Sequence, residues 1–477
     1  MGYDFDLIVI GGGAAGLVAS KFAAGVGKKV AIIERSRLGG ECTLYGCVPS
    51  KTLIRTAKVF NQINHANEVG LDTGRPLPVP GEAVLARVRR VVESVYEGHR
   101  PEVLERLGIH LIIGSPRFRD NHRIEVDGRL LSTACFIVCT GSSPLVPPIS
   151  GIETIPYLTN QTLFDIERLP RSIIVLGGGP IGIEMAQAFN YLGVKVTVLE
   201  AADRILTKED KELSDLLAGR LAAEGLALHT RTRVVGFIRR DDAIELTMED
   251  ATGRQDSISG DAVLAAVGRK ANVDSLDLEA AGVEYSSKGI KTDKRLRTTA
   301  KNIYAAGDVT GPYPFSHMAD YQARIAAQNA LFPLRRSADY RHYIWCTFTD
   351  PEFAHAGLTE DEARRRHGNN VRVYRWRYGD IDRAKTEADE FGMAKFICDR
   401  SYRLIGAHIL GSRAGELIHE AQIIKTLGVP FCKLDSIIHV YPTFSDVVKQ
   451  PSKVSHIDKL RNSLLARIAA RIFAGRG

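Results

Sequence analysis

The chain has 477 residues, 44% of them hydrophobic and 25% charged, which suits a globular protein of about three domains with a large core. Its formal net charge of +7 is too dilute to indicate a nucleic-acid-binding protein, and no aromatic-rich basic platform accompanies it. The sequence has no apolar run long enough for a membrane span, and its N-terminal segment does not resemble a signal peptide, so we expect a cytoplasmic protein.

The seven cysteines are an odd and low number for this length, which argues against a secreted disulfide framework. A disulfide that persists or cycles in a reducing compartment is usually catalytic. No cysteine or histidine spacing typical of zinc occurs, and we expect no metal-binding residues.

The chain opens with a predicted strand, turn, helix and second strand. The apolar strand covers Asp6 to Ile10, the small-residue helix Ala14 to Ala24, and the second strand Val30 to Ile33, followed by Glu34. Three glycines in G-x-G-x-x-G spacing form the turn: Gly11, Gly13 and Gly16. The first glycine permits a tight turn, the second lets the backbone approach a pyrophosphate, and the third lets helix and strand pack closely. The acid binds an adenosine ribose, so this unit predicts a dinucleotide site.

Two cysteines follow in a glycine-rich segment, Gly39 to Lys51, which reads GGECTLYGCVPSK. Cys42 and Cys47 lie just after the first dinucleotide module, where a bound redox cofactor could reach them. We therefore interpret them as a redox-active pair and not as two buried structural thiols. The other five cysteines belong to no motif, and we expect them to be structural: Cys135, Cys139, Cys346, Cys398 and Cys432.

The same module recurs after a strand predicted at Phe136 to Cys139. A strand at Ile173 to Leu176, a helix through Phe189 and a strand at Val194 to Leu199 lead to Glu200. The glycines of this copy are Gly177, Gly179 and Gly182, and in both copies the acid lies 23 positions after the first glycine. Two modules predict two dinucleotides. Glu200 suits a free 2′-hydroxyl and favours NADH, while Arg204 nearby keeps NADPH possible.

The cysteine segment, G-G-x-C-x-x-x-x-G-C-V-P-S-K, resembles the redox motif of the pyridine nucleotide–disulfide oxidoreductases, which include dihydrolipoamide dehydrogenase, glutathione reductase and mercuric reductase. The resemblance covers essentially the whole chain. It extends to five further segments: 140–142, 267–269, 303–309, 349–352 and 414–418.

The resemblance implies an α/β homodimer with two Rossmann-like dinucleotide-binding domains, one for FAD and one for NAD, and a C-terminal α+β dimerisation domain. The implied FAD-binding domain covers 1–149 and 269–335, the NAD(P)-binding domain 150–268 and the dimerisation domain 336–455.

The resemblance also implies residue roles. Cys47 would form the thiolate next to the flavin, and Cys42 would exchange with substrate. Lys51 would lie near the flavin and pair with Glu184. The implied FAD-binding residues are Gly11, Gly13, Gly16, Glu34, Lys51, Thr140, Gly141, Asp308 and His317. The implied NAD-binding residues are Gly177, Gly179, Gly182, Glu200 and Gly268.

The C-terminal signature departs from the family pattern. Members that handle thiols carry His-Pro-Thr followed by Glu, and that His, supplied by the partner subunit, acts as the base. Here Tyr441 precedes Pro442, and Asp446 replaces the Glu. A tyrosine is a poor base near neutral pH because its usual pKa is about 10. His439 could replace the base if the stretch is extended, since it would then share a face with Tyr441 about 6–7 Å away.

Tyrosine at this turn resembles mercuric reductase, although no cysteine follows Cys432 to form that branch's C-terminal pair. Three functions stay open. The first is a disulfide or dithiol oxidoreductase, and the second is a reductase of metal ions or small electrophiles. The third is a redox-sensing or docking flavoprotein with little turnover.

The segment 456–477 predicts a basic amphipathic helix, with Ile457, Leu460, Leu464 and Ile468 at helical spacing and basic residues between them. Such a helix either packs on its own dimer or docks on a membrane surface or a partner.

Overall fold

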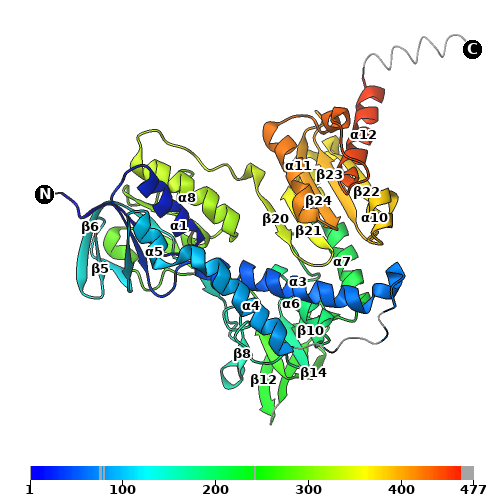
Figure 1. Ribbon diagram of the computed structural model, residues 1–477, viewed down its shortest axis with the longest axis horizontal. Helices are drawn as coiled ribbons and strands as arrows, with labels where there is room; N and C mark the ends of the chain where they lie inside the picture. Colours follow the sequence, from blue (N-terminus) through cyan, green and yellow to red (C-terminus); the bar gives the residue numbers. More distant parts are fainter. Residues whose placement is uncertain (1, 73, 75–77, 79–80, 241–242, 464–477) are drawn as a thin grey trace, which may run out of the picture.

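The computed structural model describes residues 2–463, apart from 73, 75–77, 79–80 and 241–242. Three lobes are visible in Figure 1: the N-terminal lobe carries α1 and α8, the central lobe β9 to β15, and the third lobe β20 to β24. Among the described residues, no helix is both long and apolar enough to cross a membrane. The predicted α/β class, with two dinucleotide-binding folds and a third α+β unit, is confirmed.

The N-terminal lobe is built on a seven-stranded sheet in the order β3-β2-β1-β6-β5-β4, with β19 also pairing with β6. Its strands are β1 (Phe5–Ile10), β2 (Val30–Glu34), β3 (Ile109–Ile113), β4 (Pro116–Phe118), β5 (Arg123–Val126), β6 (Arg129–Val138) and β19 (Ile303–Ala305). The helices of this part of the chain are α1 (Ala14–Gly25), α2 (Gly40–Leu44), α3 (Cys47–Asn64), α4 (Gly81–Tyr96), α5 (Pro101–Arg106) and α8 (Ser316–Leu331). A hairpin of β17 (Tyr285–Ser286) and β18 (Gly289–Ile290) lies at its edge. The central strand β1 is parallel to both neighbours, and its apolar run is buried on both faces, as such strands are.

The central lobe repeats this plan in a smaller sheet, ordered β11-β10-β9-β15-β8, with a separate three-stranded sheet, β12-β13-β14. The strands are β8 (Tyr157–Leu158), β9 (Ser172–Leu176), β10 (Lys195–Leu199), β11 (Ala227–His229), β12 (Arg233–Arg240), β13 (Ala243–Glu249), β14 (Gln255–Gly260) and β15 (Ala262–Ala265). The helices are α6 (Pro180–Tyr191) and α7 (Lys211–Ala223). The strands and helices predicted for both modules match to within one or two residues.

The two connections between these lobes pair with each other. Strand β7 (Ser142–Pro144) leaves the first lobe, and β16 (Arg269–Ala271) returns to it, and the two form an antiparallel pair. The backbone of Leu145 also donates to the Gly268 carbonyl at 2.9 Å. The central lobe is therefore an insertion, as the resemblance implies, while the exact domain boundaries stay predictions.

The third lobe contains an antiparallel sheet in the order β20-β21-β24-β23-β22. Its elements are β20 (Ile344–Thr347), β21 (Glu352–Gly357), β22 (Arg372–Arg377), β23 (Met393–Cys398), β24 (Leu404–Gly411), α9 (Glu360–His367), α10 (Asp382–Thr386), α11 (Ala414–Leu427) and α12 (Asp446–Arg461). Helix α7 of the central lobe lies close to this sheet (Figure 1). The boundary predicted at 455/456 falls inside α12, and residues 464–477 of the predicted basic helix lie outside the described residues.

Helices α3 and α4 run side by side from the first lobe across the central one (Figure 1). Helix α3 packs against α6, the helix of the second dinucleotide module. The redox segment, which starts α3, is therefore held against both modules at once.

Candidate active site

Cys42 and Cys47 lie at a helix junction, in α2 and at the first position of α3. Both are thiols, Cys42 partly buried and Cys47 exposed. A hydrogen bond from the Cys42 thiol, assisted by the positive charge of Lys51, lowers the pKa of Cys47 to about 6. The same contact, together with burial, raises the pKa of Cys42. The pair is therefore asymmetric near neutral pH, with a thiolate at Cys47 and a proton kept on Cys42.

A second residue touches this pair from the start of α8. Ser316 Oγ lies 3.6 Å from Cys47 Sγ and adds to the lowering of its pKa. The neighbouring His317 directs Nε2 to the Ile344 carbonyl at 2.7 Å, and burial lowers its pKa. His317 thus donates to the backbone as a neutral ring and ties α8 to β20.

Lys51 and Glu184 meet as the resemblance implies. Lys51 Nζ donates to Glu184 Oε2 at 2.7 Å, and the glutamate side chain is only 6% exposed. Glu184 Oε1 accepts from the Phe348 backbone N–H at 2.7 Å, and the lysine ammonium lies 4.6 Å from the centre of the Phe348 ring. One carboxylate therefore links α3, α6 and the chain after β20, and it fixes the lysine one helical turn from Cys47.

The glycine turns of both modules are shaped to receive a phosphate. A Cβ at Gly16 would lie 1.8 Å from the Gly11 carbonyl oxygen, so only glycine allows α1 to pack this closely on β1. In contrast, a Cβ at Gly179 would meet nothing within 4 Å, which leaves open space at the position expected to face a pyrophosphate. No side chain caps α1 or α6, so the N–H groups of their first turns are available to an anion, except at Pro180, which has none.

The two acids at the ends of the second strands are held in the same way. Glu34 Oε2 accepts from Gly12 N at 2.7 Å, and Glu200 Oε2 accepts from Gly178 N at 2.6 Å. Each carboxylate thus accepts a hydrogen bond from its own glycine turn and keeps further lone pairs for ribose hydroxyls. These residues fit two dinucleotides of the FAD and NAD(P) type.

The remaining predicted FAD contacts gather where the first lobe meets the inserted one. Asp308 accepts from Ser142 Oγ at 2.7 Å, and burial raises its pKa. Thr140 Oγ1 donates to the Asn272 carbonyl at 2.7 Å, and Gly141 has a left-handed φ of 69° that only glycine adopts freely. The predicted NAD residue Gly268 lies at the return point, with φ of 143°.

The predicted C-terminal residues do not form one cluster. Tyr441 is 68% exposed, and its hydroxyl donates to Asp382 Oδ2 at 2.7 Å, which raises its pKa. His439 instead places Nε2 2.6 Å from Glu420 Oε1 on α11. Residues 438–443 belong to no strand, and the two side chains have different partners, so a shared face for His439 and Tyr441 stays a prediction. Asp446 is buried at the first position of α12.

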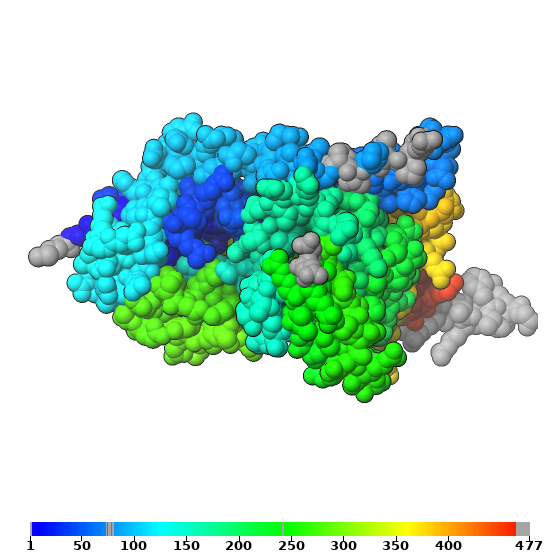
Figure 2. All heavy atoms as spheres, turned by 90° about the horizontal axis from the view of Figure 1, so that it is seen from below, coloured from blue at the N-terminus to red at the C-terminus, as the bar shows by residue number. Residues whose placement is uncertain are grey.

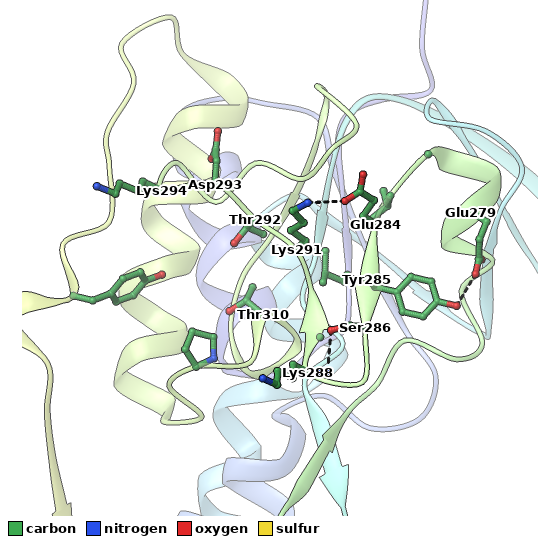
Figure 3. Close-up of a pocket in the computed structure, with 16 residues that line it drawn as sticks. Glu279, Glu284, Tyr285, Ser286, Lys288, Lys291, Thr292, Asp293, Lys294 and Thr310 are labelled. Atoms are coloured by element: carbon green, nitrogen blue, oxygen red, sulfur yellow. Dashed lines mark hydrogen bonds and ion pairs between the residues drawn. The ribbon is translucent and has the colours of Figure 1, made fainter. Parts of the chain in front are cut away.

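A large hollow of about 1110 Å³ lies elsewhere, on the β17–β18 hairpin, and none of the predicted site residues line it. Figure 3 shows Lys291 directed at Glu284 and Tyr285 directed at Glu279. Seen from below, a recess opens between the blue N-terminal segment and the yellow-green returning segment (Figure 2). These are the two segments that carry the first glycine turn and Asp308.

Comparison with known proteins decides the family. The model for pyridine nucleotide-disulphide oxidoreductases matches residues 5–330, and the model for their dimerisation domain matches residues 343–451. The chain belongs to this family.

Two curated relatives lie on different branches of the family. Mercuric reductase from Staphylococcus aureus is 33% identical over 94% of this chain and 81% of its own length. Dihydrolipoyl dehydrogenase from Thermus scotoductus is 33% identical over 95% of this chain and 97% of its own length. Among solved structures, the HOCl-induced flavoprotein disulfide reductase RclA from Escherichia coli superposes with a TM-score of 0.84 at 30% identity, covering 94% of this chain and 99% of that chain.

As a member of this family, the chain is an FAD-dependent oxidoreductase that uses NAD(P)H and carries the dimerisation domain. The sequence motifs located the cysteines, the glycines and the acids, but they missed three contacts. Glu41, inside the redox motif, pairs with Arg269 at 2.9 Å, while Ser316 and Phe348 contact Cys47 and Lys51 from distant segments. Nothing in the motif itself indicates these partners.

Proposed function

We propose that the chain is an NADH-dependent flavoenzyme that reduces a thiol-binding metal ion at Cys42 and Cys47. The observation that carries the proposal is the state of Tyr441, because thiol-handling relatives place their general base at this position. Here the hydroxyl already donates to Asp382, and its pKa is raised. It can donate a hydrogen bond but cannot remove a proton from a thiol near neutral pH.

The names of two similar proteins also favour a metal ion as the acceptor. One relative is a mercuric reductase, and RclA was also solved as a Cu(II) complex. Thiolates are the ligands that soft metal ions prefer, and Cys47 is a thiolate near neutral pH. A metal ion can displace the proton of a bound thiol, so a thiol site for a metal does not require a general base.

In the proposed reaction, one electron pair moves from NADH to the cysteine pair and then to the metal ion. Bound FAD would supply the chemistry that takes a hydride from NADH and passes an electron pair to the Cys42–Cys47 disulfide. The dithiol then binds the acceptor and passes this electron pair to one mercuric ion or two cupric ions, which re-forms the disulfide. Each turnover releases NAD⁺ and one proton. Lys51, held by Glu184, stabilises the negative charge at Cys47 whenever the pair is reduced.

We propose NADH as the reductant for a local reason. Glu200 accepts backbone N–H groups from Gly178 and, at 2.7 Å, from Ala202, which leaves a negative charge where a 2′-phosphate would lie. The nearby Arg204 donates to the carbonyls of Leu206 and Thr207 and is not turned toward that carboxylate.

We also propose that a second copy completes the site. Tyr441 is exposed and bonds to Asp382 of its own chain, and no hydrogen bond or ion pair recorded for it among the described residues reaches the cysteines of that chain. In the family, the equivalent segment is supplied by the partner subunit. The exposed residues around Tyr441, Ile438 at 98% and Val440 at 77%, provide apolar surface for that contact.

One observation favours a dithiol substrate as the second candidate. His439 Nε2 lies 2.6 Å from Glu420 Oε1, and a histidine oriented by a glutamate is the arrangement that thiol–disulfide exchange needs. In this reading His439 replaces the base two residues from its usual position, and the physiological acceptor is a dithiol or disulfide of the dihydrolipoyl type.

The test compares acceptors under identical anaerobic conditions, with NADH as the donor. The acceptors are mercuric ion, cupric ion, lipoamide, glutathione disulfide and a quinone. We expect turnover with a metal ion to exceed turnover with lipoamide at least tenfold, and Cys47→Ser to abolish both. Faster turnover with lipoamide that is lost in His439→Gln would overturn the proposal in favour of the second candidate.

A further inference from the structure

A row of polar side chains crosses the sheet of the third lobe on one face. Trp345 on β20 pairs with His355 on β21, His355 with His408 on β24, and His408 with Lys395 on β23. Both histidines and the lysine are at most 2% exposed. Such a row is unusual in a sheet interior, because each buried polar group needs a partner.

The partners come from the central lobe, just before α7. Glu209 accepts from Trp345 Nε1 at 2.5 Å and lies 2.9 Å from His355 Nδ1. Asp210 accepts from Lys395 Nζ at 2.6 Å. The row is therefore a contact between two lobes, and the chain segment 209–210 supplies its acidic side.

The hydrogen bonds of the two histidines fix their tautomers. His355 Nε2 lies 2.7 Å from the Gly357 carbonyl, and His408 Nε2 lies 2.9 Å from the Leu358 carbonyl. A carbonyl only accepts, so both Nε2 atoms carry protons. In a neutral ring the other nitrogen, Nδ1, is then an acceptor with a free lone pair. Metal-binding histidines are commonly oriented in this way, with one N–H donated to a backbone carbonyl.

When both rings are neutral, neither the Nδ1 atom of His355 nor that of His408 faces a hydrogen-bond donor. His355 Nδ1 faces the Glu209 carboxylate, and two acceptors at 2.9 Å repel each other unless a cation lies with them. His408 Nδ1 is buried and has no hydrogen-bond partner among the described residues. A proton on His355 would satisfy the first contact but would leave His408 Nδ1 unpaired.

The geometry is that of a metal site. One ligand atom from each of Glu209, His355 and His408 lies within 4.8 Å of the other two. Ligands of tetrahedral zinc, bound at about 2.0–2.1 Å, lie about 3.3 Å apart, so small side-chain rotations close the site. Two imidazoles and a carboxylate form a donor set that zinc uses, with water completing the tetrahedron.

The surrounding charges also favour a cation. Four carboxylates meet in this layer, those of Glu209, Asp210, Glu212 and Glu360. Three cations face them: Lys395, Arg375 and Arg364. Apart from the two histidines, the carboxylates of this layer outnumber its cations by one, beside the unpaired Nδ1 of His408.

We propose that Glu209, His355 and His408 bind a structural divalent cation of the zinc class, which links the central lobe to the third lobe. The site is separate from the cysteine pair and does not depend on the proposed function. It departs from the sequence-based expectation of no metal-binding residues, because its ligands lie 146 and 53 positions apart in the chain and form no motif.

The test measures metal content in the full-length holoenzyme, produced with zinc in the medium, purified without a metal-affinity step and dialysed against a weak chelator. We expect about one zinc per chain. His408→Gln and Glu209→Gln should each lower the zinc content at least tenfold while FAD content stays unchanged. The matched control is His456→Gln, which removes a histidine paired with Asp435 at 2.7 Å elsewhere and should keep the metal.

X-ray absorption at the zinc edge provides a readout that does not depend on the variants. The proposal requires a shell of nitrogen and oxygen at about 2.0–2.1 Å and no sulfur at about 2.3 Å. Sulfur scattering would place the metal on the cysteines and overturn the proposal. Wild-type protein with less than a tenth of a zinc per chain would overturn it as well, and so would full occupancy in His408→Gln.

Discussion

The charge of Lys51 is expected to set the pKa of Cys47, and Lys51→Met removes that charge. The two residues are separated by one turn of α3, which places their side chains about 6 Å apart. At an effective dielectric constant of about 20, a unit charge at that distance contributes about 2.8 kcal/mol, or about two pKa units. Because the Lys51 side chain is 34% exposed, solvent screens this by about half. We therefore expect the pKa of Cys47 to rise from about 6 by about one unit.

The measurement is a pH titration of the long-wavelength charge-transfer absorbance in the anaerobic, NADH-reduced enzyme. Cys47 has a lowered pKa, so its thiolate is present above about pH 6 and is lost as the pH falls through that value. In Lys51→Met the thiolate fraction at pH 7 should fall from about 90% to about half. Lys58→Met is the matched control, since Lys58 lies on the same helix and pairs with Asp350 at 2.6 Å. A midpoint in Lys51→Met that shifts no more than in the control would refute the electrostatic argument.

Three further predictions concern Tyr441, the cysteine pair and the ion pair between Lys395 and Asp210. Tyr441→His should raise lipoamide turnover at least tenfold because it restores a base of suitable pKa, and Tyr441→Phe should not. Binding of one mercuric ion to the reduced cysteine pair should release about one proton at pH 7.5 and about two at pH 5, measured with a pH indicator, because Cys47 is already ionised above about pH 6. Lys395→Met leaves Asp210 buried without its cation and should lower the melting temperature by about 5–10 °C in calorimetry, whereas the exposed Lys385→Met should leave it unchanged.

The parts of the molecule that local sequence determines were predictable. Each dinucleotide module is a strand, a turn and a helix within about 30 residues, and its glycines are required by close approaches such as that of Gly16 to Gly11. The cysteine pair lies at the start of a helix within the same short segment. Such features leave a pattern because all their contacts are near in sequence.

Most contacts between distant segments left no pattern, and the Lys51–Glu184 pair was expected only from the family resemblance. Ser316 reaches Cys47 across 269 positions, and Glu41 meets Arg269 only because the returning strand β16 pairs with β7. His355 and His408 face each other because of the register of an antiparallel sheet, which single-sequence reasoning could not set. The predicted relation between His439 and Tyr441 rested on an extended backbone; in the structure the two side chains have different partners, Glu420 and Asp382.

The asymmetry of the cysteine pair connects the missing base to the choice of acceptor. Dithiol exchange needs the proton of Cys42 removed and a proton delivered to the departing thiolate, and the raised pKa of Cys42 makes the first step slow without a base. A thiophilic metal ion needs neither transfer, because it binds the Cys47 thiolate first and then lowers the pKa of the second thiol itself. The hydrogen bond from Tyr441 to Asp382 can persist through such a cycle, since no step asks the tyrosine to ionise. We therefore expect the tyrosine at position 441 to slow dithiol exchange while it leaves a metal-ion reaction intact.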